Sequence, residues 1–137
     1  MSTVFSPFEG AWTYRSFLRN PDVDTEFNDL RFGLGTLVLH EPVRGEVSGH
    51  LGGPGWQLEL KGWATHGNPG QLRFQGIGEI DGEPWVYDYL GYFSPAWPNG
   101  VDERPAIVGT IVRTVAHSHG QSPAGVVASW IAVKQEQ

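Results

Sequence analysis

The chain has 137 residues, a length that corresponds to one domain over residues 1–137. Its 19 glycines and 10 prolines argue against long helices, while 39% hydrophobic and 12% aromatic residues are enough to build a core. The formal net charge of −6 argues against a nucleic acid partner, and the absence of cysteine excludes disulfides and thiolate chemistry.

The N-terminal ten residues contain neither a basic segment nor a continuous apolar run, so we expect no signal peptide. No apolar run approaches the roughly 20 residues that a membrane helix needs. The sequence therefore predicts a cytoplasmic protein without a membrane partner.

Turn-forming clusters of Gly, Pro, Asn and Asp divide the chain into segments in which apolar and polar residues alternate, as in WQLELK at 56–61. Such alternation is typical of a strand with one face on a core and the other in water. Eight strands are predicted, over residues 9–18, 31–40, 43–51, 56–64, 71–80, 84–93, 105–116 and 125–134. The acidic residues 20–29 do not alternate; we expect a solvated connection there, with a lid or a short helix as the alternative.

The links between these strands are too short for the helical crossovers of a parallel sheet, so neighbouring strands should be antiparallel. Eight antiparallel strands close into an up-and-down barrel, which removes the exposed sheet edges. Glycines within the strands, such as Gly62, Gly91 and Gly109, indicate bends or close backbone approaches. The fold prediction is an all-β, eight-stranded antiparallel barrel, with an eight-stranded sandwich as the alternative.

The first predicted strand opens with Gly10-Ala11-Trp12, which resembles the Gly-x-Trp start of the calycin group of lipocalins, fatty-acid-binding proteins and avidins. The resemblance implies that Trp12 packs across the bottom of the barrel and that a basic residue of the last strand, here Lys134, lies over its ring. The short hairpins and the chain length look more avidin-like than lipocalin-like. Biotin binding is not expected, because the biotin-binding residues of avidins cannot be matched to positions in this chain.

The segment over residues 84–92 carries the densest group of aromatic residues. Trp85, Tyr87 and Tyr89 share one face of this strand and Asp88 lies on the other, but a one-residue slip would exchange the two faces. Facing inward, the three rings would line a cavity; facing outward, they would form a subunit interface of a homo-oligomer. Trp97, which lies between two prolines, is a further candidate for closing the barrel mouth, contacting another subunit or covering the core.

Three further residues are candidates for chemistry inside the barrel. Asp88 has apolar neighbours on its face and needs a partner, and Arg113 is the first charge of the next strand, so an Asp88–Arg113 ion pair is predicted. Tyr14, on the first strand, is a candidate for a hydroxyl in the cavity.

Two histidines in the segment His117-Ser118-His119 have the spacing that places both rings on one face of a strand. A metal would need a third and usually a fourth ligand, and the sequence offers none at a suitable spacing. We expect a turn with two solvated histidines and no metal. Nucleotide-binding and serine-hydrolase motifs are absent, so no cofactor is expected.

These observations predict a barrel that binds one small apolar or aromatic molecule in its open end. The residues expected in or near the pocket are Tyr14, Trp85, Tyr87, Asp88, Tyr89 and Arg113. The alternative is a cofactor-independent isomerase, cyclase or lyase in which Asp88 is the general acid or base and Arg113 sets its pKa. Tyr14 or Tyr89 would then stabilise a developing oxyanion.

Overall fold

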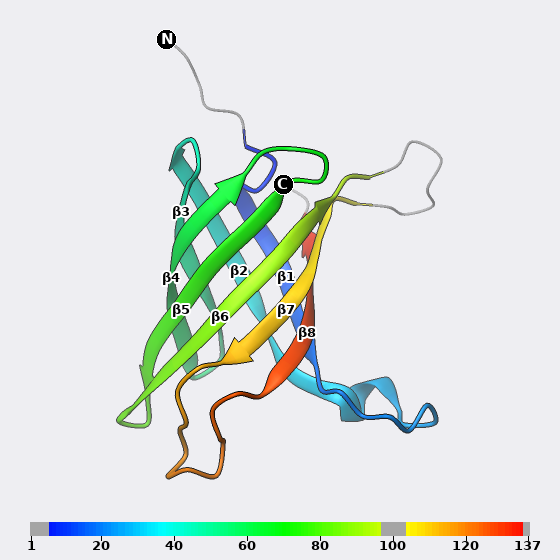
Figure 1. The fold of residues 1–137 in the computed structure, drawn as a ribbon, viewed down its shortest axis with the longest axis vertical. Coiled ribbons are helices and arrows are strands. Elements are labelled where there is room, and N and C mark those ends of the chain that lie inside the picture. Colours follow the sequence, from blue (N-terminus) through cyan, green and yellow to red (C-terminus); the bar gives the residue numbers. More distant parts are fainter. Residues whose placement is uncertain (1–5, 97–103, 136–137) are drawn as a thin grey trace.

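The computed structural model describes residues 6–96 and 104–135, and within them eight strands close into one antiparallel barrel (Figure 1). The strands are β1 (Gly10–Phe17), β2 (Arg31–Val43), β3 (Glu46–Gly53), β4 (Trp56–Thr65), β5 (Gln71–Ile80), β6 (Glu83–Ser94), β7 (Ala106–Arg113) and β8 (Val127–Lys134). Every strand pairs with its neighbours in the sequence, and β1 closes the sheet by pairing with β8. The barrel prediction is confirmed, and the sandwich alternative is wrong.

The predicted strand boundaries are correct to within three residues, and one of the larger shifts is at the end of β7. This strand stops at Arg113 rather than at residue 116, because the chain then enters the β7–β8 loop, whose turn is closed by hydrogen bonds between His117 and Ser122. The acidic connection is mostly irregular and exposed, and it ends in one short 3-10 helix, η1 (Phe27–Leu30). Among the described residues, no helix is long and apolar enough to cross a membrane.

Alternate residues of each strand point inward and fill most of the barrel, as the period of two requires. The Trp130 ring lies close over Gly91, and Gly91 is paired directly with Gly109 of the neighbouring strand. A Cβ atom on Gly109 would overlap the carbonyl oxygen of Leu90, so only glycine allows the two strands to lie this way. The expectation that strand glycines mark close approaches is confirmed at this pair.

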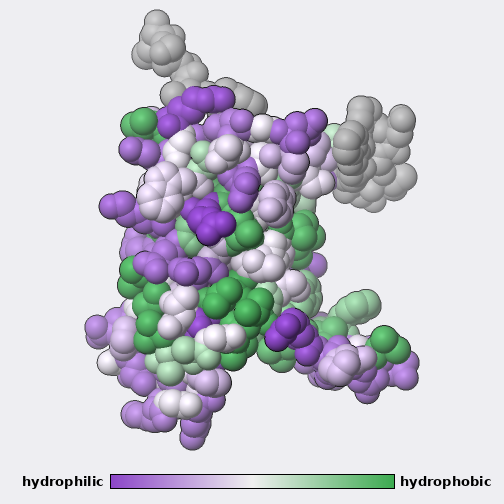
Figure 2. Space-filling view, viewed as in Figure 1, coloured by the Kyte–Doolittle hydropathy of each residue, from purple (hydrophilic) through white to green (hydrophobic). Residues whose placement is uncertain are grey.

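The outer face of β4 to β7 mixes apolar and polar side chains, as the green and purple residues of Figure 2 show. Ile77, Tyr92 and Val108 are each about half exposed on it, and Trp63 is 67% exposed. A broad depression on this face is lined in part by exposed charged side chains such as Lys61, so it opens to water. The formation of a homo-oligomer by copies of this chain stays a prediction.

The end of the barrel nearest the N-terminus, at the top of Figure 1, is closed by Trp12 and Phe8, which are fully buried. The indole Nε1–H of Trp12 donates to the carbonyl oxygen of Phe8 at 2.9 Å. The Lys134 ammonium lies 4.8 Å from the centroid of the Trp12 indole and donates to the carbonyl oxygen of Glu9. The expected cation over this indole is therefore confirmed.

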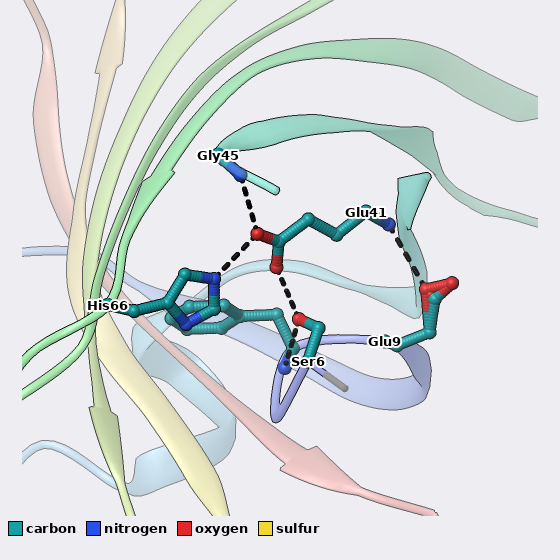
Figure 3. A network of polar contacts seen from close by, with 6 residues as sticks. Ser6, Glu9, Glu41, Gly45 and His66 are labelled. Carbon is teal, nitrogen blue, oxygen red and sulfur yellow. Dashed lines mark hydrogen bonds and ion pairs between the residues drawn. The ribbon is translucent and has the colours of Figure 1, made fainter. Parts of the chain in front are cut away.

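A buried carboxylate, that of Glu41, ties this end together (Figure 3). It accepts hydrogen bonds from the Ser6 hydroxyl and, at 2.7 Å, from the Gly45 N–H, and it pairs with His66 Nε2 at 2.6 Å. Ser6 and His66 both bind the carboxylate and no hydrogen bond joins them to each other, so the three do not form a hydrolytic relay. The contacts hold the N-terminal segment against β2 and the β4–β5 loop.

The contacts of Glu41 set the pKa of its carboxyl group. Burial alone raises the pKa of this carboxyl, but hydrogen bonds from Gly45 and Ser6 and the pairing with His66 outweigh burial, so the pKa lies below its ordinary 4.5. A carboxyl with a lowered pKa stabilises the fold above pH 4.5, and this contribution is lost as the pH falls through the lowered value.

We predict that Glu41→Gln lowers the free energy of unfolding at pH 7 by about 2 kcal/mol, because the buried partners of the carboxylate lose a charged acceptor. In urea unfolding between pH 3 and pH 7, the free energy of unfolding of this variant should also fall less steeply as the pH decreases. Glu46→Gln, at an exposed position, is the matched control and should follow the unmodified protein. Equal stability of the two variants would contradict the role of Glu41 as a clamp.

Candidate ligand-binding site

A cavity of about 340 Å³ opens at the other end of the barrel, near the β5–β6 hairpin and the β7–β8 loop at the bottom of Figure 1. Its volume falls in the range of small-molecule pockets. Its walls are mostly aromatic and aliphatic, with a few hydroxyls. The lining residues are Tyr14, Ser16, Phe32, Gly33, Gly55, Trp56, Leu58, Ile80, Trp85, Tyr87, Tyr89 and Ile111.

The aromatic residues of β6 face inward. Trp85, Tyr87 and Tyr89 all line the cavity, and the two tyrosines are only 5% and 3% exposed. The Tyr89 ring stacks on Phe74 with centroids 4.8 Å apart and meets Tyr14 edge to face at 6.4 Å. Four of the six residues predicted for the pocket thus lie in its wall. The alternative in which these rings form an outward subunit interface is wrong.

Asp88 lies on the outside of the barrel, so its predicted place in the cavity is wrong. Its carboxylate is exposed and accepts a hydrogen bond from Gln75 Nε2 at 3.1 Å. In the register of β6 and β7, Asp88 lies opposite Val112, whereas Arg113 lies opposite Tyr87. Successive residues of a strand point to opposite faces, and the predicted Asp88–Arg113 ion pair is therefore not formed.

Arg113 is not itself a lining residue; it is buried beside the cavity, in contact with two aromatic residues of the lining. Its guanidinium carbon lies 5.2 Å from the ring centroid of Phe32 and 5.8 Å from that of Tyr87. Its Nε–H donates to the Tyr87 hydroxyl and its Nη1–H to the carbonyl oxygen of Pro123, both at 3.3 Å. The guanidinium is fixed in place by these contacts rather than by a carboxylate.

His117 is the residue that sequence reasoning missed. Its ring is 4% exposed and stacks on the Trp85 indole at 3.8 Å with an interplanar angle of 10°. Its Nε2 lies 2.8 Å from the Tyr87 hydroxyl, which is free to donate because it already accepts from Arg113. His119 is exposed, so the prediction of two solvated histidines is correct for His119 and wrong for His117.

The turn that carries His117 is fixed by Glu83, at the start of β6. The Glu83 carboxylate accepts the backbone N–H groups of Ser118 and His119 at 3.0 and 3.1 Å. Both of these residues have positive φ angles, of 57° and 56°, a conformation that spacing alone does not reveal. Trp85, Tyr87, Arg113 and His117 together form what we call the rim cluster.

Burial favours the neutral forms of Tyr14, Tyr89 and His117. It raises the pKa of Tyr14 to about 12, although the nearby Ser16 and Tyr89 hydroxyls counter part of the rise, and it raises the pKa of Tyr89 well above its ordinary 10. Burial and, to a lesser extent, the positive charge of Arg113 lower the pKa of His117 below its ordinary 6.5, while Glu83 acts in the opposite direction. The two phenols and the imidazole are therefore neutral at pH 7.

Two buried polar atoms at the cavity have no hydrogen-bond partner: the hydroxyl oxygen of Ser16 and the indole Nε1 of Trp85. Ser16 is fully buried, and both residues line the cavity. Buried polar groups are almost always paired, and an unpaired one costs about 1–3 kcal/mol. The wall of the cavity therefore contains hydrogen-bonding capacity that the described residues do not use.

Residues 6–96 and 104–135 bring no three potential metal ligands together in one place. Trp97, the further candidate for closing the mouth, lies outside the described residues. No family model, no curated protein and no solved structure matches this chain. The function is therefore inferred from the site itself.

We predict that His117 makes the fold sensitive to weak acid. Because its pKa is lowered in the folded state, the unfolded chain takes up more protons below pH 6.5, and stability falls there by up to about 1.4 kcal/mol per pH unit. Urea unfolding of His117→Gln should show a smaller loss between pH 6.5 and pH 5. His119→Gln, two residues away and exposed, should keep the profile of the unmodified protein; parallel profiles for all three would contradict the assignment.

Proposed function

We propose that this protein binds one small, largely apolar aromatic molecule in the cavity at the open end of the barrel. The observation that carries the proposal is a cavity of about 340 Å³ at one end of the barrel, with aromatic walls and two unpaired polar atoms. Protein interiors are close-packed, and cavities of this size and character are the usual sites of small ligands. A bound aromatic molecule would fill the space and give the polar atoms a partner.

The walls also limit what the ligand can be. Phe32, Trp56 and Trp85 offer ring faces and edges, which favour a flat aromatic body over a flexible polar one. Hydroxyls of Ser16 and Tyr14 and the indole N–H of Trp85 stand at fixed points of the wall, so an acceptor group on the ligand would set its orientation.

We also propose that the barrel has a calycin-like architecture. The Gly10-Ala11-Trp12 start, the Lys134 ammonium over the Trp12 ring and the closed eight-stranded barrel support it. Trp12 closes one end of the barrel, and the cavity lies at the other end.

The isomerase, cyclase or lyase alternative assigned the acid–base step to Asp88. That carboxylate faces water on the outside of β6 and cannot reach a ligand in the cavity. Binding is therefore the function that we propose.

The test uses N-phenyl-1-naphthylamine, a neutral aromatic probe whose fluorescence rises in an apolar site. We expect one probe molecule per chain. Ile80→Trp, at a lining position of β5, should weaken binding at least tenfold because the larger side chain occupies the cavity.

The matched control is Ile77→Trp, on the outer face of the same strand, which should bind the probe like the unmodified protein. Equal loss of binding in both variants, or none in Ile80→Trp, would show that the probe binds elsewhere and would overturn the proposal.

A further inference from the structure

The rim cluster contains a buried positive charge without a negative partner. Arg113 is 8% exposed, and among the described residues no carboxylate lies within ion-pair distance of its guanidinium. A buried charge is costly unless it is paired, and buried arginines are normally paired with a carboxylate. The Arg113 guanidinium is therefore available to pair with an anion from outside the chain.

Two acidic residues near the rim cluster, Glu83 and Asp88, form hydrogen bonds with other partners. The Glu83 carboxylate accepts the backbone N–H groups of the His117 turn, and Asp88 lies outside the barrel bonded to Gln75. The neutral hydroxyl of Tyr87 and the carbonyl oxygen of Pro123 take one N–H each from Arg113. A guanidinium has five N–H groups, so these two bonds leave three available.

The other polar groups beside the cavity can also donate hydrogen bonds. The indole Nε1–H of Trp85 is an unpaired donor, and the Ser16 hydroxyl, also unpaired, can donate as well. Trp85 is linked to Arg113 through His117 and Tyr87, so these donors belong to one connected rim. Such a site selects a ligand that accepts hydrogen bonds and carries negative charge.

We propose that the ligand of this cavity is an aromatic carboxylic acid, whose ring lies among the aromatic walls and whose carboxylate binds the Arg113 guanidinium. The inference rests on the proposed function and adds the chemical class of the ligand. One guanidinium matches the single negative charge of one carboxylate. The carboxylate geometry matches the paired N–H groups along an edge of the guanidinium.

The experiment compares 1-naphthoic acid with 1-naphthamide, which have nearly the same shape and differ in charge, by titration calorimetry at pH 7.5. The unmodified protein should bind the acid at least about tenfold more tightly than the amide, because a hydrogen bond to a charged group is stronger than one to a neutral group. This comparison needs no variant, so it stands whether or not a substitution at Arg113 folds.

Arg113→Gln should remove the preference for the acid, because it weakens binding of the acid more than binding of the amide. Arg73→Gln removes one positive charge from the outer face and should keep the preference, which separates a local contact from the net charge of the protein. Trp85→Phe keeps a ring at the rim but loses the indole N–H, and it should weaken binding of the acid more than that of the amide.

The outcomes separate this inference from the proposed function. Equal affinity of the unmodified protein for acid and amide, each at one molecule per chain, would overturn the carboxylate assignment and leave the aromatic-binding function in place. An acid preference that survives in Arg113→Gln would overturn the role of this arginine. Binding of neither compound would overturn both proposals, because the cavity would then not take an aromatic ligand.

Discussion

The pairing of β1 with β8 is the constraint on which the rest of the structure depends. Once the sheet is closed, each strand has one face inside and one in water, and the register of each pair fixes which residues those are. This is why Arg113 is inside and Asp88 outside, although both have apolar neighbours. Because no described strand has a free lateral edge, new contacts with other molecules must involve the outer face or the ends of the barrel.

The two ends of the barrel are built differently, and this difference determines which end holds the candidate site. One end is filled by Phe8 and Trp12 and tied by the buried Glu41 carboxylate, whose partners come from three separate parts of the chain. The other end is lined by aromatic rings that pack around a space and do not fill it. Its polar groups are held by one another in the rim cluster, so they are rigid before any ligand arrives, which favours tight binding.

The fold could be predicted because strand alternation and turn chemistry are local properties of the sequence, visible in stretches such as 56–61. The same alternation identifies two faces of β6 but not which one is inside, since that choice depends on the register against β5 and β7. Arg113 was expected near the pocket and lies beside it, but Asp88, its expected partner, lies on the outside of the barrel. The place of His117 depends on the positive-φ turn held by Glu83 from 35 residues away, a contact that no local pattern contains.

The central claim is that the cavity at the open end holds a small molecule. Native mass spectrometry of the protein isolated from its own source tests it most directly, with the denatured mass as the reference. We predict a native mass above that of the chain by one small molecule per chain, and release of that molecule on denaturation. A native mass equal to that of the bare chain or of its oligomer, in protein never exposed to denaturant, would contradict the account.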